Sequence, residues 1–188
     1  MSSKFLLIVV LFCGFLGKAQ EANKEESVSV KKVASQSLNQ KFSSKVLYAY
    51  QENSKSKIDD LFSYFQMLTD ANLKTDLKKE VIDNIHLLFQ NPNLLVIDFT
   101  SDSLNKIPLQ QFIQKLLFSE PISFSVSDEV TYDSVAYQSW NTNYIITKRK
   151  LGIVTKMNVT EKVFFYETSK QFGIDTKVVN ATLLGAMN

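Results

Sequence analysis

Two side chains in this sequence are candidates for acid–base chemistry, His86 and Asp98. Asp98 ends the apolar stretch LLVIDF, so a fold that buries this stretch would desolvate the carboxylate and raise its pKa toward the range of a useful general base. The alternative is that Asp98 caps the turn after a strand, which is the commoner role of such a residue. His86 lies about one helical turn from Ile82 and Phe89, and this spacing favours a histidine at the edge of a packed helix face over a general base.

Other reactive constellations are absent from the sequence. His86 is the only histidine and Cys13 the only cysteine, so no set of His and Cys ligands is available for zinc. The sequence also lacks a glycine-rich phosphate loop and a serine in a glycine elbow. These absences favour a protein that is not an enzyme, without deciding the question, and we expect neither a metal nor an organic cofactor.

Residues 1–20, MSSKFLLIVVLFCGFLGKAQ, have the parts of a secretory signal peptide: a basic start at Lys4, an apolar run from Phe5 to Leu16, and small residues near the end. The run is too short to cross a membrane as a helix. We therefore expect cleavage, export to the periplasm or the cell exterior, and no integral membrane span. Cys13 lacks the small preceding residue of a lipoprotein signal, which predicts that it is removed with the peptide and carries no lipid.

The rest of the chain divides into two parts. Residues 21–36 are charged and rich in serine, which predicts a flexible leader, and residues 37–188 are expected to form a single domain. Cleavage would remove Lys4 and Lys18 from the 21 basic residues, leaving 19 against 19 acidic ones. This balance gives no electrostatic reason to expect nucleic acid or an anionic membrane as a partner.

The apolar residues change their period along the domain. Helical spacing occurs in residues 57–69, 75–90 and 108–120, with Ser56 and Asp59 in a capping-box pattern. Residues 37–50 also have helical spacing and are interpreted as a helix, with a strand at KVLYAY as the alternative. A short buried strand is predicted at 94–99. Beyond Pro121 apolar and polar residues alternate, which predicts antiparallel strands near residues 122–130, 136–150, 153–170 and 177–185, with a turn at Leu151-Gly152. Helices followed by antiparallel strands predict an α+β domain.

This order of elements resembles the nuclear transport factor two-like superfamily, which includes the ketosteroid isomerases, and cystatin-like rolls share much of it. The resemblance covers roughly residues 44 to 186. It implies that N-terminal amphipathic helices pack on a curved C-terminal antiparallel sheet as a cone-like roll with an apolar and aromatic pocket. It also implies a homodimer through the open sheet face. The expected pocket residues are Trp140, Tyr144, Phe164 and Tyr166.

Two short triplets suggest modification. The ending GKAQ and the Lys, Asn and Phe usage are similar to those of secreted Bacteroidota proteins. In that group, the triplets DSL and DSV around Ser103 and Ser134 resemble a signal for O-glycosylation. Ordinary loop hydroxyls are the alternative interpretation of both serines.

The sequence as a whole predicts an exported, non-catalytic domain that binds a small apolar ligand or another cell-envelope protein. One alternative is an isomerase- or dehydratase-like enzyme that uses Asp98 or His86 inside a pocket. A second alternative is a purely structural envelope protein with a solid core and no cavity for a ligand.

Overall fold

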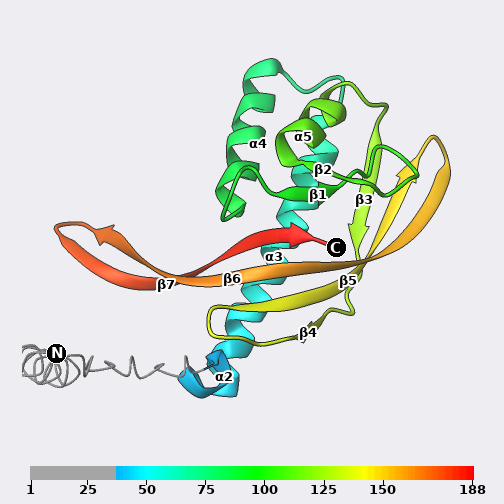
Figure 1. Cartoon of the computed structure of the whole chain (residues 1–188). Helices are drawn as coiled ribbons and strands as arrows, with labels where there is room; N and C mark the ends of the chain where they lie inside the picture. The colour runs from blue at the N-terminus through cyan, green and yellow to red at the C-terminus, as the bar shows by residue number, and fades with distance from the viewer. Residues whose placement is uncertain (1–36) are drawn as a thin grey trace, which may run out of the picture. The chain divides into compact units, whose positions relative to one another are not determined.

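The computed structural model describes residues 37–188, and the predicted signal peptide, the fate of Cys13 and the predicted leader lie outside the described residues. The protein has an α+β fold in which helices come first and a strongly curled antiparallel sheet, a half-barrel, follows (Figure 1). The elements are α2 (Leu38–Lys41), α3 (Ser44–Leu68), α4 (Thr75–Leu88), β1 (Leu95–Ile97), β2 (Lys106–Pro108), α5 (Leu109–Leu117), β3 (Ile122–Val126), β4 (Thr131–Asp133), β5 (Ser139–Lys150), β6 (Ile153–Phe172) and β7 (Asp175–Met187).

The main sheet has five strands in the order β3-β5-β6-β7, and β4 pairs with β5 beside β3. Two-residue turns join its long strands, because Lys150 pairs with Ile153 and Phe172 pairs with Asp175. The predicted turn at Leu151-Gly152 is confirmed. A separate antiparallel pair, β1 and β2, packs near α5 and β7.

Strand alternation gives the sheet a buried inner face. Even-numbered residues of β5 and odd-numbered residues of β6 point inward, as the period of two requires. The buried members of this face are Trp140, Thr142, Tyr144, Ile146 and Lys148 on β5, and Met157, Val159, Glu161, Val163 and Phe165 on β6.

The long helix α3 differs from the sequence prediction. We expected a helix to begin near residue 57 after a capping box, but α3 runs without interruption from Ser44 to Leu68. Nothing in the serine-rich segment breaks the helix, because the hydroxyls of Ser54 and Ser56 bind back to the carbonyls of Gln51 and Glu52 inside it. The serine pattern of a cap therefore occurs in the middle of a helix.

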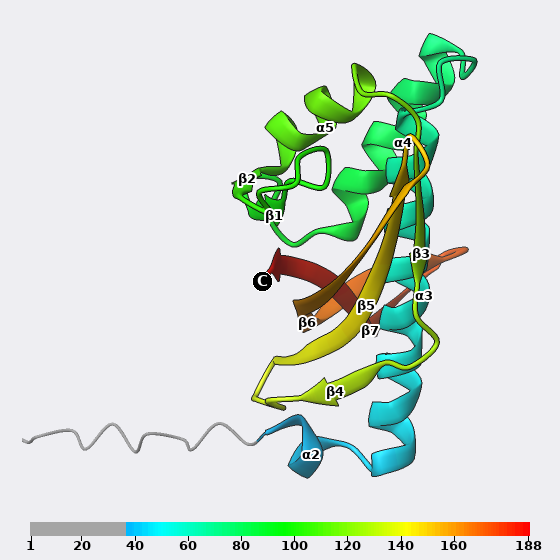
Figure 2. The same cartoon turned by 90° about the vertical axis from the view of Figure 1, so that its right-hand side faces the viewer.

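An aromatic core fills the space between α3 and the inner face of the sheet. Phe62 of α3 lies at its centre, with ring centroids 5.4 Å from Phe99, 5.4 Å from Phe124 and 6.1 Å from Tyr144. Figures 1 and 2 show α3 crossing the strands along the height of the sheet, with α4, α5 and the β1–β2 pair at one end. These ring contacts join α3 to β3 through Phe124 and to β5 through Tyr144.

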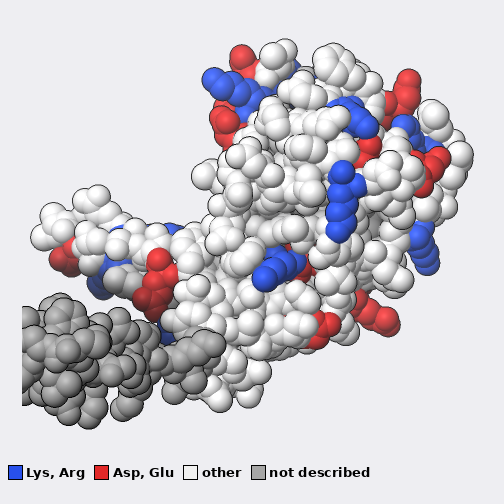
Figure 3. Space-filling view, viewed as in Figure 1, with Lys and Arg blue, Asp and Glu red and all other residues white. Residues whose placement is uncertain are grey.

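The far ends of β6 and β7 form a two-stranded arm, residues 167–180, that extends away from α3 (Figure 1). Its turn has Gly173 at a φ of 65° and Ile174 almost fully exposed. At its base Lys41 of α2 forms a 2.8 Å ion pair with Glu167. Figure 3 shows the arm with acidic and basic groups along it and mainly uncharged atoms at its tip.

Candidate functional site

Asp98 is buried, but its surroundings are those of a structural carboxylate. It follows β1 and accepts hydrogen bonds from the backbone N–H of Thr100 at 3.0 Å and from Lys115 Nζ at 2.6 Å. Burial by itself would raise the pKa of Asp98, but the hydrogen bonds from Lys115 and Thr100 outweigh it and hold the pKa below the ordinary value. The expectation of a raised pKa was wrong, because the sequence could not show that Lys115 would reach this carboxylate.

The buried acid with a raised pKa is Glu161, which the sequence analysis did not select. It is fully buried on the inner face of β6, where burial raises its pKa to about 8. Tyr144 donates its hydroxyl hydrogen to Glu161 Oε2 at 2.8 Å. The sequence does contain a signal for the burial of Glu161. Met157, Val159, Glu161 and Val163 alternate along the strand and so lie on one face, and the other three residues are apolar, which indicates a buried face.

Three buried polar atoms near this pair lack a hydrogen-bond partner among the described residues. They are the second oxygen of Glu161, the hydroxyl of Thr142 and the indole nitrogen of Trp140. Thr142 lies directly opposite Glu161 in the sheet, and Trp140 is the next inward residue of β5. The structure thus places the predicted residues Trp140 and Tyr144 on one face with Glu161.

Phe164 and Tyr166 lie on the opposite face of β6 from Trp140 and Tyr144, because they have the other strand parity. Both are half-buried. The Phe164 ring packs over Gly185 of β7, where a Cβ would lie only 2.6 Å from the ring. The expectation of a single aromatic pocket containing all four residues was therefore wrong, as alternation separates them.

The remaining predicted residues lie elsewhere. His86 is half-buried in the last turn of α4, and its Nδ1 has no hydrogen-bond partner among the described residues. Ser103 and Ser134 are both exposed, Ser103 in the loop between β1 and β2 and Ser134 after β4. Exposure is what O-glycosylation would require, and the modification stays a prediction.

The second feature of interest is the turn region between β5 and β6. We call Lys148–Lys156 the hairpin end. Leu151, Ile153 and Val154 are 74%, 70% and 51% exposed there. The same nine residues include four cations and no acid, the cations being Lys148, Arg149, Lys150 and Lys156. A chain whose formal net charge is only +2 thus has a local concentration of positive charge beside exposed apolar groups.

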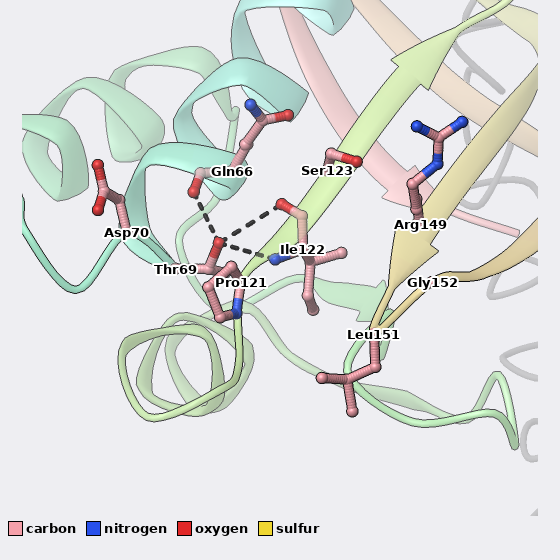
Figure 4. Close-up of a pocket in the computed structure, with 9 residues that line it drawn as sticks. All are labelled: Gln66, Thr69, Asp70, Pro121, Ile122, Ser123, Arg149, Leu151 and Gly152. Carbon is pink, nitrogen blue, oxygen red and sulfur yellow. Dashed lines mark hydrogen bonds between the residues drawn. The ribbon is translucent and has the colours of Figure 1, made fainter.

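Three surface pockets border the hairpin end. The first, which we call the β3 pocket, has a volume of about 410 Å³ and includes Arg149, Leu151 and Gly152. Figure 4 shows Asp70 and Arg149 on opposite sides of this pocket. Its wall is fixed by Thr69, whose hydroxyl donates to the carbonyl of Gln66 and accepts from the N–H of Ile122.

The other two pockets share Thr100 and Lys150. The α5 pocket, of about 480 Å³, is bordered by Lys115 and by Phe118, which is 87% exposed. The loop pocket, of about 210 Å³, lies between the loop after β1 and the hairpin end. Its lining residues are Thr100, Asp102, Lys148, Lys150, Leu151, Ile153 and Thr155. Each of the three pockets thus includes at least one residue of the hairpin end.

Comparisons with protein-family models, with curated proteins and with solved structures give no match to this chain. The resemblance to the nuclear transport factor two-like superfamily therefore stays a prediction from element order. Within residues 37–188, no helix combines the length and apolar character that a membrane span needs. In the same residues, no three His, Cys, Asp or Glu side chains gather as a metal site would require.

Proposed function

We propose that the described domain is a non-catalytic binding module, and that its hairpin end, Lys148–Lys156, holds anionic amphiphiles, molecules that join an apolar group to a negative charge. The proposal specifies the binding function predicted from the sequence, and export stays a prediction alongside it. The observation that carries the proposal is Leu151, an exposed leucine in a left-handed turn beside three consecutive basic residues.

Leu151 is unfavourable for the fold in two ways. Its φ is 49°, and a left-handed backbone costs a residue with a Cβ about 1–2 kcal/mol, which is why Asn or Gly usually occupies such turns. Its side chain is also 74% exposed, so little apolar burial offsets this cost. Together with its exposed neighbours Ile153 and Val154, Leu151 forms an apolar patch that does not serve the stability of the fold, and such patches are typical of binding surfaces.

The charges around Leu151 define the second requirement on the ligand. Lys148, Arg149 and Lys150 precede the turn and Lys156 follows it, with no acid in the segment. Such a local field attracts negative groups even when the whole chain is near neutrality. Exposed apolar side chains with a cationic surround therefore favour a ligand that is apolar and anionic together.

The test is a Leu151→Asn variant of the full chain, titrated with dodecyl phosphate below its micelle concentration and followed by calorimetry. We expect the Kd to rise about tenfold because the leucine contact is lost. We also expect the free energy of unfolding to increase by about 1 kcal/mol because asparagine tolerates the left-handed turn. The matched control is Ile174→Asn in the other two-residue turn, which is 99% exposed and should leave the Kd unchanged. Wild-type affinity in the Leu151→Asn variant would refute the proposal.

A second candidate function is proton-transfer catalysis, and the Tyr144–Glu161 pair favours it. A carboxyl with a raised pKa beside a tyrosine is a suitable general acid or base, in place of the predicted Asp98 and His86. Catalysis requires that small molecules reach Glu161, which is fully buried. Native-state modification with a water-soluble carbodiimide, located by peptide mass, tests this access, and an unmodified Glu161 next to modified surface carboxylates would exclude the enzyme.

A further inference from the structure

We propose that the loop pocket binds the phosphate head group of a phospholipid, so that the hairpin end docks the domain on an anionic membrane surface. This inference rests on the proposed function and names the source of the anionic amphiphile. It follows from the charge inside the pocket, from the apolar residues at its rim, and from their order along the hairpin.

The pocket has more positive than negative charge. Lys148 and Lys150 line it against one carboxylate, Asp102. The Lys148 side chain is only 4% exposed, and its ammonium pairs with a single carboxylate, Asp102 Oδ1 at 3.2 Å, and with the carbonyl of Ser101 at 3.4 Å. The Asp102 side chain is fully exposed and so shares its charge with water. A buried ammonium that is weakly matched in this way gains from a second anion.

Lys150 and the hydroxyl of Thr155 supply spare donors. The Lys150 ammonium donates one hydrogen bond, to the carbonyl of Thr100 at 3.2 Å, and an ammonium has three donors. Thr155 also lines the pocket and carries a hydroxyl group, whereas the hydroxyl of Thr100 already donates to Asp98. Ammonium and hydroxyl donors around a small cavity match the oxygen atoms of a phosphate.

The rim of the pocket distinguishes a lipid from a free phosphate ion. Leu151 and Ile153 line the pocket and are 74% and 70% exposed, and an inorganic ion would leave them in water. Phe118 lines the adjoining α5 pocket, which shares Thr100 and Lys150 with the loop pocket. Apolar groups on both sides of a cationic pocket fit the acyl region next to a head group.

The order of residues along the hairpin also matches a bilayer. Leu151 is at the turn, whereas Lys148 and its strand partner Thr155 lie three and four residues from it. At about 3.3 Å per residue the lysine is about 10 Å behind the tip. Apolar side chains of surface-bound segments enter the boundary between head groups and acyl chains by about 5–10 Å, with lysines at the phosphates.

The experiment is co-sedimentation of the full chain with vesicles of phosphatidylglycerol and phosphatidylcholine in equal parts, compared with pure phosphatidylcholine. We expect the wild type to bind the mixed vesicles, to bind the neutral ones more weakly, and to dissociate as salt is added. Lys150→Gln should weaken binding to the mixed vesicles about fivefold, because it removes the attraction of one lysine to an anionic surface. Thermal melting of each variant establishes that it is folded.

Two control variants separate the pocket from general attraction. Lys156→Gln removes a hairpin-end charge that does not line the loop pocket, and Lys170→Gln removes one from the arm. Lys150→Gln is expected to lose more binding than Lys156→Gln, and Lys170→Gln to lose none. Equal losses for Lys150→Gln and Lys156→Gln would overturn the head-group pocket.

The outcomes also separate this inference from the proposed function. Binding of dodecyl phosphate without binding of the mixed vesicles would overturn the membrane inference and leave the function standing. Competition by inorganic phosphate at the same concentration as the lipid would identify a free phosphate ion as the ligand and overturn the inference as well. Failure to bind dodecyl phosphate at all would overturn the proposed function, and the membrane inference with it.

Discussion

Asp98 and Glu161 are carboxylates in the same core, 1% and 0% exposed, yet their pKa values shift in opposite directions. Asp98 accepts hydrogen bonds from a lysine and a threonine, whereas Glu161 accepts one from a tyrosine. Desolvation acts on both and favours the neutral form. The donors to Asp98, Lys115 first and Thr100 second, decide the difference in pKa, because together they stabilise the charged form of Asp98.

The two acids belong to different functional hypotheses. The Asp98 carboxylate binds the N–H and the hydroxyl of Thr100, and the carbonyl of Asp98 accepts from the hydroxyl of Ser101. The loop held in this way borders the loop pocket and the α5 pocket. Asp98 is therefore an anchor for the proposed binding surface, and Glu161 belongs to the competing catalytic hypothesis.

The largest expected effect is the dependence of stability on pH caused by Glu161. Its pKa is about 8 in the folded protein and about 4.5 ordinarily, so the folded state retains a proton that the unfolded state has lost between these values. The free energy of unfolding should therefore fall as the pH rises from about 4.5 to about 8, by on the order of 4 kcal/mol, and level off above.

Glu161→Gln is the matched variant for this effect, because glutamine keeps the shape and an oxygen that accepts from Tyr144. Its free energy of unfolding, measured by urea denaturation at a series of pH values, should lose the decline. At pH 8 the variant should be more stable than the wild type. A decline of the same size in both proteins would show that Glu161 is ionised in the fold.

Asp98→Ala tests the other half of the comparison and should have a smaller effect with the opposite dependence on pH. Loss of the carboxylate leaves Lys115 and the N–H of Thr100 without their acceptor, at a cost of about 2 kcal/mol near neutral pH. Because the pKa of Asp98 is lowered, this stabilisation is present above the ordinary aspartate pKa and is lost as the pH falls through the folded value.

Asp98→Asn serves as the control for that experiment, since it keeps an oxygen for Thr100 and removes the charge that pairs with Lys115. We expect its destabilisation to be intermediate and its melting temperature to converge with that of the wild type in acid. Binding of dodecyl phosphate should weaken in Asp98→Ala because the loop loses its anchor. Unchanged stability at neutral pH would contradict the structural role of Asp98.

Tyr144→Phe is expected to have the smallest effect. It removes one hydrogen bond to Glu161, which should cost about 1 kcal/mol. That bond lowers the pKa of Glu161, so its loss should move the upper limit of the pH decline to a higher pH. Tyr166→Phe, on the opposite face of β6, should change neither quantity. Circular dichroism melts at several pH values measure both.

The sequence predicted the fold class because periodicity is local. The period of two in residues 122–185 and the helical spacing before it are set by which side chains face the core. The sequence pattern gave the wrong start for α3, because the serines before residue 57 resemble a helix cap. A helix that packs along its whole length can include such residues of weak helix propensity in its interior. The strand predicted at 94–99 is confirmed as β1, whereas its partner β2 and the edge strand β4 were not predicted, because three-residue strands without an apolar run are too short to show a period.

The candidate site was predictable only in part. Trp140 and Tyr144 were selected for their type, and the structure does place them on the inner face. Glu161 was not selected, although its parity along β6 indicated burial, because an acid in a strand is usually interpreted as an exposed residue. The loop pocket could not be predicted, as it joins the loop after β1 to residues about 50 positions later in the chain.

By itself the sequence determined that helices precede antiparallel strands, the turn at Leu151-Gly152 and the cluster of basic residues before it, since each depends on neighbours in the chain. Tertiary structure alone decided that Lys115 pairs with Asp98, that the hydrogen bond to Glu161 within residues 37–188 comes from Tyr144, and that Lys148 and Lys150 meet the loop after β1. The physical reason is that desolvation and Coulomb interaction depend on distance in space, and folding brings together charges that the chain keeps far apart.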